Sequence, residues 1–113
     1  MMTIKDLLHI TEGSLLTPQI DQARPVSSGY CCDLLSWVMA HGSADMAWIT
    51  VQTHLNVVAV ASLHEMSCII LPEGIRMEGA ALDKAAQEGI AVITSALSAY
   101  ALCARMAAAG IPA

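Results

Sequence analysis

Four polar side chains lie close together directly after an apolar run, at Gln52, Thr53, His54 and Asn56. Their amide, hydroxyl and imidazole groups donate and accept hydrogen bonds, and histidine adds a charge that can change near neutral pH. This combination suits the binding of a small polar or anionic molecule. In a simpler interpretation, Thr53 is a helix N-cap, Asn56 belongs to the first helical turn, and His54 is an exposed loop residue.

Two other segments carry similar polar groups after apolar runs, at Pro72-Glu73-Gly74 and at residues 94–98. The serines of the second segment are also typical helix caps. If all three segments meet, they form one polar edge on an otherwise apolar protein. The ligand-binding residues predicted at this edge are Gln52, Thr53, His54, Asn56, Glu73, Gly74, Thr94, Ser95 and Ser98.

The cysteines and histidines give little support for catalysis. Cys68 and Cys103 lie inside an apolar strand and an apolar helix, which indicates core positions. The Cys31-Cys32 pair precedes a helix, whose N-terminus can lower a thiol pKa, so a thiol enzyme would use one of these two with His54. The chain has no CxxC, HxxxH or HExxH spacing and no phosphate-binding glycine motif. We therefore expect a non-enzyme with no metal and no cofactor.

The elements that position the polar edge follow a regular alternation. Short β-branched runs at 46–51, 67–71 and 90–95 alternate with alanine-rich runs at 56–65, 80–88 and 98–110. This alternation predicts βαβ crossovers and a parallel sheet, in which ligands gather beyond the carboxyl ends of the strands. Residues 57–61 would also suit a strand, but a helix is predicted because parallel neighbours need a crossover.

Residues 1–45 add a helix and short strands. Thr3 is expected to cap a helix over 4–10 that Gly13 ends, and "VSSGYCC" reads as a strand. Asp33 is expected to cap a helix over 34–41. The prediction is a single α/β domain over residues 1–113. It is three-layer-like, with a mostly parallel sheet built from βαβ units plus the N-terminal helix and short strands.

Composition excludes several functions. Five basic residues are scattered singly and the net charge is −5, so no cationic stripe exists and nucleic-acid binding is not expected. The uncharged windows 46–64 and 89–104 are interrupted by polar residues, so no membrane span is expected. With no signal peptide recognised, the protein is expected to be cytoplasmic, with reduced thiols. Because 56% of residues are apolar, part of that surface should stay exposed and favour a homodimer or a partner protein.

Three segments resemble the DRTGG domain family: "CCDLLSWVMAHG", "WITVQTHLNVVAVASLHEMSCIIL" and "EGIAVITSALSAYALCARMAAAGI". The resemblance spans Cys31 to Ile111. Where many members carry the Asp-Arg-Thr-Gly-Gly-like motif, this chain has residues 52–56. Where many carry Thr-Gly-Gly, it has Pro72-Glu73-Gly74, and Ser98-Ala99-Tyr100 stands at the usual Asp-Thr-Phe-like helix start.

The resemblance implies an α/β module similar to the N-terminal domain of HPr kinase/phosphorylase and to a segment of bacterial phosphotransacetylases. A similar domain lies beside CBS pairs in some pyrophosphatases. In these proteins the module looks regulatory or dimerising, and short free-standing members often accompany hydrogenase-related redox systems of anaerobic bacteria. Three hypotheses follow for this chain: a ligand-sensing or dimerising regulatory module, a structural homodimeric adaptor without a ligand, and a Cys/His-dependent enzyme.

Overall fold

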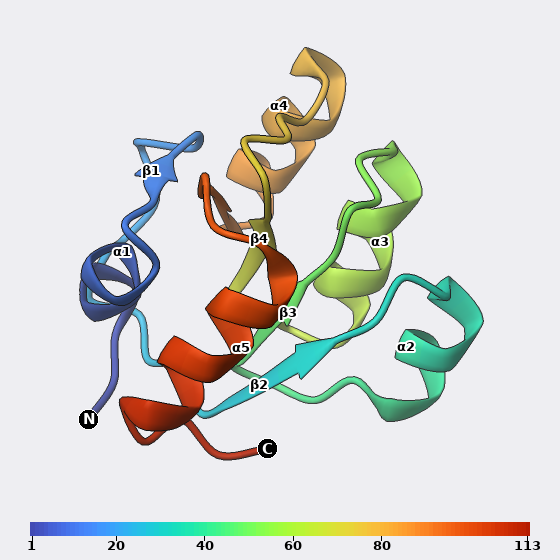
Figure 1. Cartoon of the computed structure of the whole chain (residues 1–113). Helices are drawn as coiled ribbons and strands as arrows, with labels where there is room; N and C mark the ends of the chain where they lie inside the picture. Colours follow the sequence, from blue (N-terminus) through green and yellow to red (C-terminus); the bar gives the residue numbers. More distant parts are fainter.

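The computed structural model describes residues 1–113, which form five helices and five strands (Figure 1). In chain order these are α1 (Ile4–Thr11), β1 (Ser14–Leu15), β2 (Ser28–Cys31), α2 (Leu35–His41), β3 (Met46–Ile49), α3 (Leu55–Leu63), β4 (Cys68–Leu71), α4 (Gly79–Gln87), β5 (Ala91–Thr94) and α5 (Ala99–Ala108). The predicted helix over 57–61 is confirmed. No helix combines the length and the apolar content that crossing a membrane would require.

The five strands form one sheet in the order β1-β5-β4-β3-β2. The predicted parallel pairing of the three apolar runs is confirmed, since β3 pairs with β4 and β4 with β5 in parallel. β2 adds a fourth parallel strand beside β3, with Tyr30 opposite Trp48. Only β1 is antiparallel, and its two residues pair with the end of β5.

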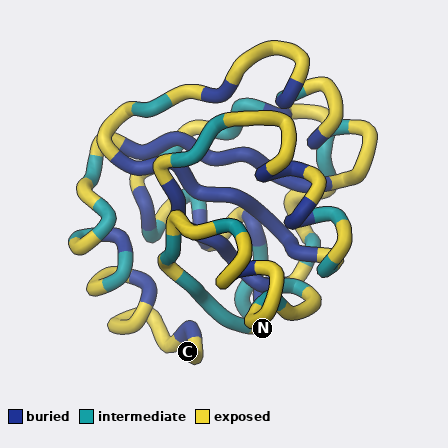
Figure 2. The backbone as a smooth tube through the Cα atoms, turned by 90° about the vertical axis from the view of Figure 1, so that its right-hand side faces the viewer, coloured by how far each residue is buried: buried dark blue, intermediate teal, exposed yellow.

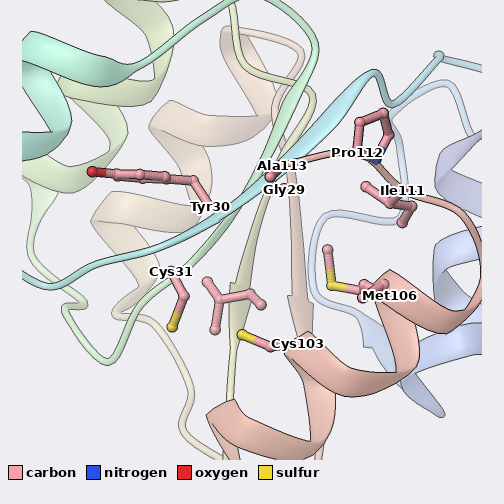
Figure 3. Close-up of a pocket in the computed structure, with 10 residues that line it drawn as sticks. Gly29, Tyr30, Cys31, Cys103, Met106, Ile111, Pro112 and Ala113 are labelled. Atoms are coloured by element: carbon pink, nitrogen blue, oxygen red, sulfur yellow. The ribbon is translucent and has the colours of Figure 1, made fainter.

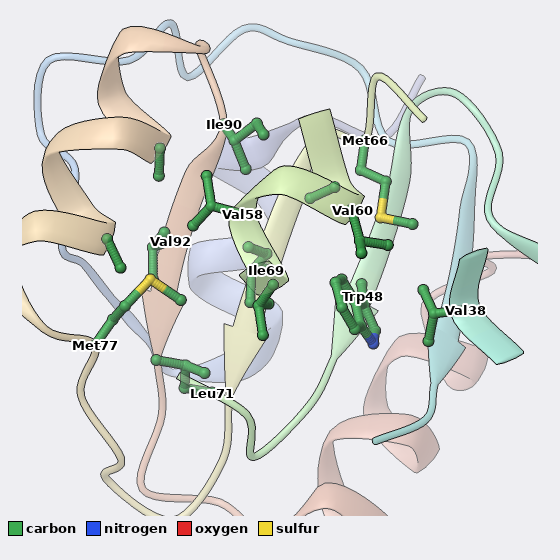
Figure 4. Packing of buried hydrophobic residues seen from close by; sticks show 14 of the residues in the cluster. Val38, Trp48, Val58, Val60, Met66, Ile69, Leu71, Met77, Ile90 and Val92 are labelled. Atoms are coloured by element: carbon green, nitrogen blue, oxygen red, sulfur yellow. The ribbon is translucent and has the colours of Figure 1, made fainter. Parts of the chain in front are cut away.

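Helices cover both faces of the sheet, which confirms the α/β prediction (Figure 1). One apolar cluster joins α2, α3 and α4 to one face, and Trp48 is buried in it (Figure 4). A second cluster joins α1 and α5 to the other face, where Ala47 and Ile49 of the same strand point. The three central strands β3, β4 and β5 are therefore buried on both sides, as Figure 2 shows, and this explains their apolar sequences, whereas β2 at the edge is only partly buried.

The ends of α1 agree only in part with the sequence prediction. Thr3 caps the helix as predicted, and its hydroxyl and the Asp6 carboxylate form a reciprocal capping box. The helix ends at Glu12, which takes the left-handed conformation at φ 51°, and not at Gly13. Gly13 is needed for a different reason: a Cβ there would lie 2.5 Å from Cγ2 of Ile93.

Two other predicted caps are wrong. α2 begins after Leu34, and no side chain caps it, because the Asp33 carboxylate bonds elsewhere. α3 begins after His54, so Thr53 lies one residue outside the cap position and bonds no helical N–H. Gly89 and Gly110 follow α4 and α5 in the left-handed region, with φ of 72° and 94°.

Candidate functional site

The four parallel strands end at one edge of the sheet, and the loops that follow them carry the predicted binding residues. The loops cover residues 32–34 after β2, 50–54 after β3, 72–78 after β4 and 95–98 after β5. We call this set the polar edge. It has two halves that differ in how many of their polar groups are already hydrogen-bonded.

Asp33 joins the loops after β2 and β3. Its Oδ1 accepts a bond of 2.8 Å from the Thr50 hydroxyl and one of 2.9 Å from the Val51 N–H. Gln52 completes the connection, because its Nε2 donates to the Asp33 carbonyl at 3.1 Å. Gln52 thus serves partly to hold the edge together. The sequence predicts a helix cap at Asp33, although its place two residues after a strand that ends at the same edge was a signal for this role.

The loops after β4 and β5 bond to each other. The N–H of Glu73 donates to the Leu97 carbonyl at 2.9 Å, and that of Gly74 to the Ser95 carbonyl at 2.8 Å. The chain leaves β4 toward the face covered by α4 and leaves β5 toward the face covered by α5. Ligands of open α/β sheets commonly bind at such a divergence. Here backbone hydrogen bonds join the two loops across the divergence.

The hydroxyls of Thr94 and Ser95 are used inside the protein. Thr94 is 8% exposed and donates to the Ile75 carbonyl at 2.6 Å. Ser95 is 2% exposed; it donates to the Thr11 carbonyl at 2.6 Å and accepts from the Leu97 N–H. These residues fix the loops in place and present no free hydroxyl to a ligand. Ser98 is exposed and caps α5 by accepting from the Ala101 N–H, which confirms the capping interpretation.

The remaining polar groups are open to solvent. His54 and Asn56 are exposed, Thr53 is half-buried, and none of the three side chains makes a hydrogen bond within the chain. No side chain caps α3; the Val57 N–H donates to the His54 carbonyl at 3.0 Å, and the N–H groups of Leu55 and Asn56 are free to meet an acceptor. In the next loop Glu73 and Arg76 are exposed and form no ion pair. We call residues 53–56 and 73–76 the open half of the polar edge.

Two of the four thiols, those of Cys31 and Cys68, have a raised pKa. Burial, followed by the neighbouring Cys103 thiol and then by the charges of Asp33 and Cys32, raises the pKa of Cys31 to about 11. The lowered pKa on which the thiol-enzyme hypothesis depends is therefore not found at Cys31. Cys68 is a core residue as predicted, and burial raises its pKa to about 12. Cys103 is half-buried and packs against the second apolar cluster, so it lies at the border of the predicted core.

Comparison with known proteins gives a fold and no family. No protein-family model matches the chain, and no curated protein matches it. The structure is similar to the CBS and DRTGG domains of the regulatory region of Clostridium perfringens pyrophosphatase, a crystal structure in complex with the activator diadenosine tetraphosphate. The TM-score is 0.75 at 12% sequence identity. The match covers 93% of this chain and 46% of that one, so this chain spans less than half of its neighbour.

Proposed function

We propose that this protein is a non-enzymatic regulatory domain of the DRTGG type that binds a small anionic metabolite at the open half of the polar edge. The observation that carries the proposal is the set of unpaired groups at the start of α3, namely the side chains of His54 and Asn56 and the N–H groups of Leu55 and Asn56. The N-terminal end of a helix attracts anions because its free N–H groups and its dipole point toward them. Arg76 in the adjacent loop supplies a cation without an internal partner.

The structural neighbour supports this proposal by analogy. It belongs to the regulatory region of a pyrophosphatase, and its complex contains an anionic nucleotide activator. For the present chain we extend the analogy to the class of ligand only. The cytoplasmic location and a place beside a hydrogenase-related redox system are further parts of the proposal, and they depend on composition and on the family resemblance.

A ligand-binding assay by thermal unfolding tests the proposal. The probes are inorganic phosphate, AMP, ATP and diadenosine tetraphosphate. A ligand at a hundred times its Kd stabilises the native state by about 2.7 kcal/mol, which raises the Tm by on the order of 10 °C for a domain of this size. We expect such a rise with at least one phosphate-bearing probe.

Variants locate the binding site. His54→Ala should abolish the rise in Tm, and Arg76→Ala should reduce it. His9→Ala is the matched control, because His9 is also an exposed histidine but lies on α1, on the opposite face of the sheet. The proposal fails if no probe raises the Tm, or if His54→Ala and His9→Ala respond alike.

A homodimeric role is a second candidate, favoured by the apolar surface beside the polar edge. Leu34, Trp37, Val51 and Leu55 are large apolar residues with 46–60% of their surface exposed. All four belong to the loops after β2 and β3 or to the helices that follow them. Exposed apolar residues that gather in this way are typical of protein interfaces. We propose that two copies of the chain associate through this surface, with or without the ligand.

A further inference from the structure

The imidazole ring of His64 lies between the C-terminal ends of two neighbouring helices. Its Nδ1 is 2.9 Å from the Val60 carbonyl oxygen of α3, and its Nε2 is 2.8 Å from the Met39 carbonyl oxygen of α2. Both oxygens belong to the last turn of their helix, and no backbone N–H donates to that of Met39. The ring packs closely against Gly42, where a Cβ would lie 2.7 Å from the His64 Cδ2. Both ring nitrogens thus face a hydrogen-bond acceptor.

The protonated ring is the form of His64 that satisfies both contacts. A neutral imidazole has a single N–H, so it donates to one carbonyl oxygen and turns a nitrogen lone pair toward the other. An imidazolium donates to both oxygens. Its positive charge is also favoured at this place, because the C-terminal end of a helix carries the negative end of the helix dipole and two such ends meet here.

Few contacts hold α2 in place. Val38 is the only buried residue among its seven, and it belongs to the apolar cluster of Figure 4. In Figure 3, which looks into the apolar pocket between β2 and α5, the Tyr30 side chain leaves β2 on the side away from Cys31. Its ring stacks on His41 of α2, with the ring centroids 6.3 Å apart. Among the side-chain hydrogen bonds, only that of His64 joins α2 to the end of α3.

We propose that His64 is a proton-dependent latch that holds α2 against α3. The imidazolium donates to both helices, and when its proton leaves to solvent one of the two hydrogen bonds is lost and α2 loosens. The latch is therefore strongest in acid and weakens as the pH rises through the range in which histidine loses its charge. It lies beyond the C-terminal end of α3, whereas His54 precedes the N-terminal end, so it does not depend on the proposed ligand.

The other charges near the ring are paired or directed elsewhere. The ionisable side chains on the segments around His64 are His41, Asp45, Glu65, Arg24 and Glu88. None of them forms an ion pair with His64. Asp45 lies 3.8 Å from the Arg24 guanidinium, and the exposed Glu65 carboxylate has no partner. Glu88 pairs with Lys84 at 2.9 Å, and the His41 ring lies against Trp37. The direct partners of the His64 nitrogens are the two carbonyl oxygens.

Amide hydrogen exchange of the full chain, measured by NMR as protection factors, tests the latch. The reporters are the Val38 and Gly42 N–H groups, which donate to the Leu34 and Val38 carbonyls along α2. Between about pH 5.5 and about pH 8 we expect their protection to fall on the order of tenfold in the wild-type protein. His64→Gln cannot change its charge, so its protection factors should change by less than about twofold over the same range.

His41→Gln is the matched control, because the His41 ring bonds only within α2, and this variant should keep the wild-type response. Long-range proton–nitrogen spectra of the wild-type imidazoles give a readout that needs no variant. Both His64 nitrogens should carry a proton at about pH 5.5, and one should have lost it at about pH 8. Protection that does not change with pH, an unaltered response in His64→Gln or a lost response in His41→Gln would overturn the proposal. So would a His64 ring that stays protonated, or stays neutral, over the whole range.

Discussion

At the scale of single residues, Asp33 accepts three hydrogen bonds that join the loops after β2 and β3. One carboxylate oxygen accepts both the Thr50 hydroxyl and the Val51 N–H, and the Asp33 carbonyl accepts from Gln52. Thr50 is buried, so its hydroxyl would lose its acceptor without this carboxylate. Asp33 thereby fixes the direction in which the chain leaves β3 toward His54.

Cys31 gives a prediction about pH. Because burial and the neighbouring Cys103 raise its pKa to about 11, little thiolate forms at neutral pH. We expect its alkylation by iodoacetamide at pH 7 to be on the order of 100-fold slower than that of free cysteine, whose pKa is about 8.5. The rate should keep rising about tenfold per pH unit up to pH 10, because the thiolate fraction does so.

Site-resolved mass spectrometry of the alkylated peptides measures this rate. The urea-unfolded chain is the control, since Cys31 should there react as free cysteine does. A rate in the folded protein that levels off below pH 9 would contradict the raised pKa. It would also restore the hypothesis of a reactive thiol.

At the scale of elements, the sequence predicted the central sheet well. The apolar runs ending near Ile49, Leu71 and Thr94 form β3, β4 and β5, because strands covered on both faces carry apolar residues continuously. Residues 57–61 could be assigned to a helix only from topology. The side chain of His64, just after this helix, then joins α3 to α2, with Nε2 at 2.8 Å from the Met39 carbonyl.

The details of the candidate site were less predictable. Thr94 and Ser95 look like any polar residues after a strand, and their burial follows from bonds to Ile75 and Thr11, which are distant in sequence. The exposure of Cys103 depends on how α5 packs beside β2, which no local pattern encodes. Asp33 could accept hydrogen bonds either as a helix cap or from the loop after β3. Only the register of β2 against β3 decides between these two roles.

Two glycines at element boundaries give a matched test of packing. A Cβ at Gly13, between α1 and β1, would lie 2.5 Å from Ile93 Cγ2 and 3.1 Å from the Thr94 carbonyl oxygen. Gly79 begins α4, and a Cβ there would meet nothing within 4 Å. We expect Gly13→Ala to lower the free energy of unfolding by about 1–3 kcal/mol. Gly79→Ala should leave it unchanged or raise it by up to about 1 kcal/mol.

Urea denaturation followed by circular dichroism measures both free energies. Equal stability of the two variants would show that the space around Gly13 relaxes more easily than the contacts imply. A loss of stability in Gly79→Ala would instead contradict the open surroundings of that residue.

At the scale of the whole molecule, the apolar surface next to the polar edge predicts self-association. Trp37 is 54% exposed although tryptophan is usually covered, and its ring lies against His41. We expect sedimentation velocity at micromolar concentration to show a dimer. Trp37→Asp should convert the dimer to a monomer, because a charge at this position would have to be desolvated on association.

Tyr100→Asp is the control for this experiment. Tyr100 is also a highly exposed aromatic residue, but it lies on α5 on the opposite face, so the variant should remain a dimer. A monomeric wild-type protein at micromolar concentration would refute the dimer. If Tyr100→Asp dissociates the dimer and Trp37→Asp does not, the interface lies on the face covered by α5 and the proposed surface is refuted.

The bond between the Gly29 N–H and the Pro112 carbonyl bears on resistance to aggregation. β2 is the outermost parallel strand, and its unpaired backbone groups could template the addition of a strand from another molecule. The tail occupies one of these groups, and Pro112 has no N–H with which to continue the pattern outward. Residues 111–113 thus protect the open edge of β2. Without them, β2 could pair with a strand from another molecule and begin fibre-like aggregation.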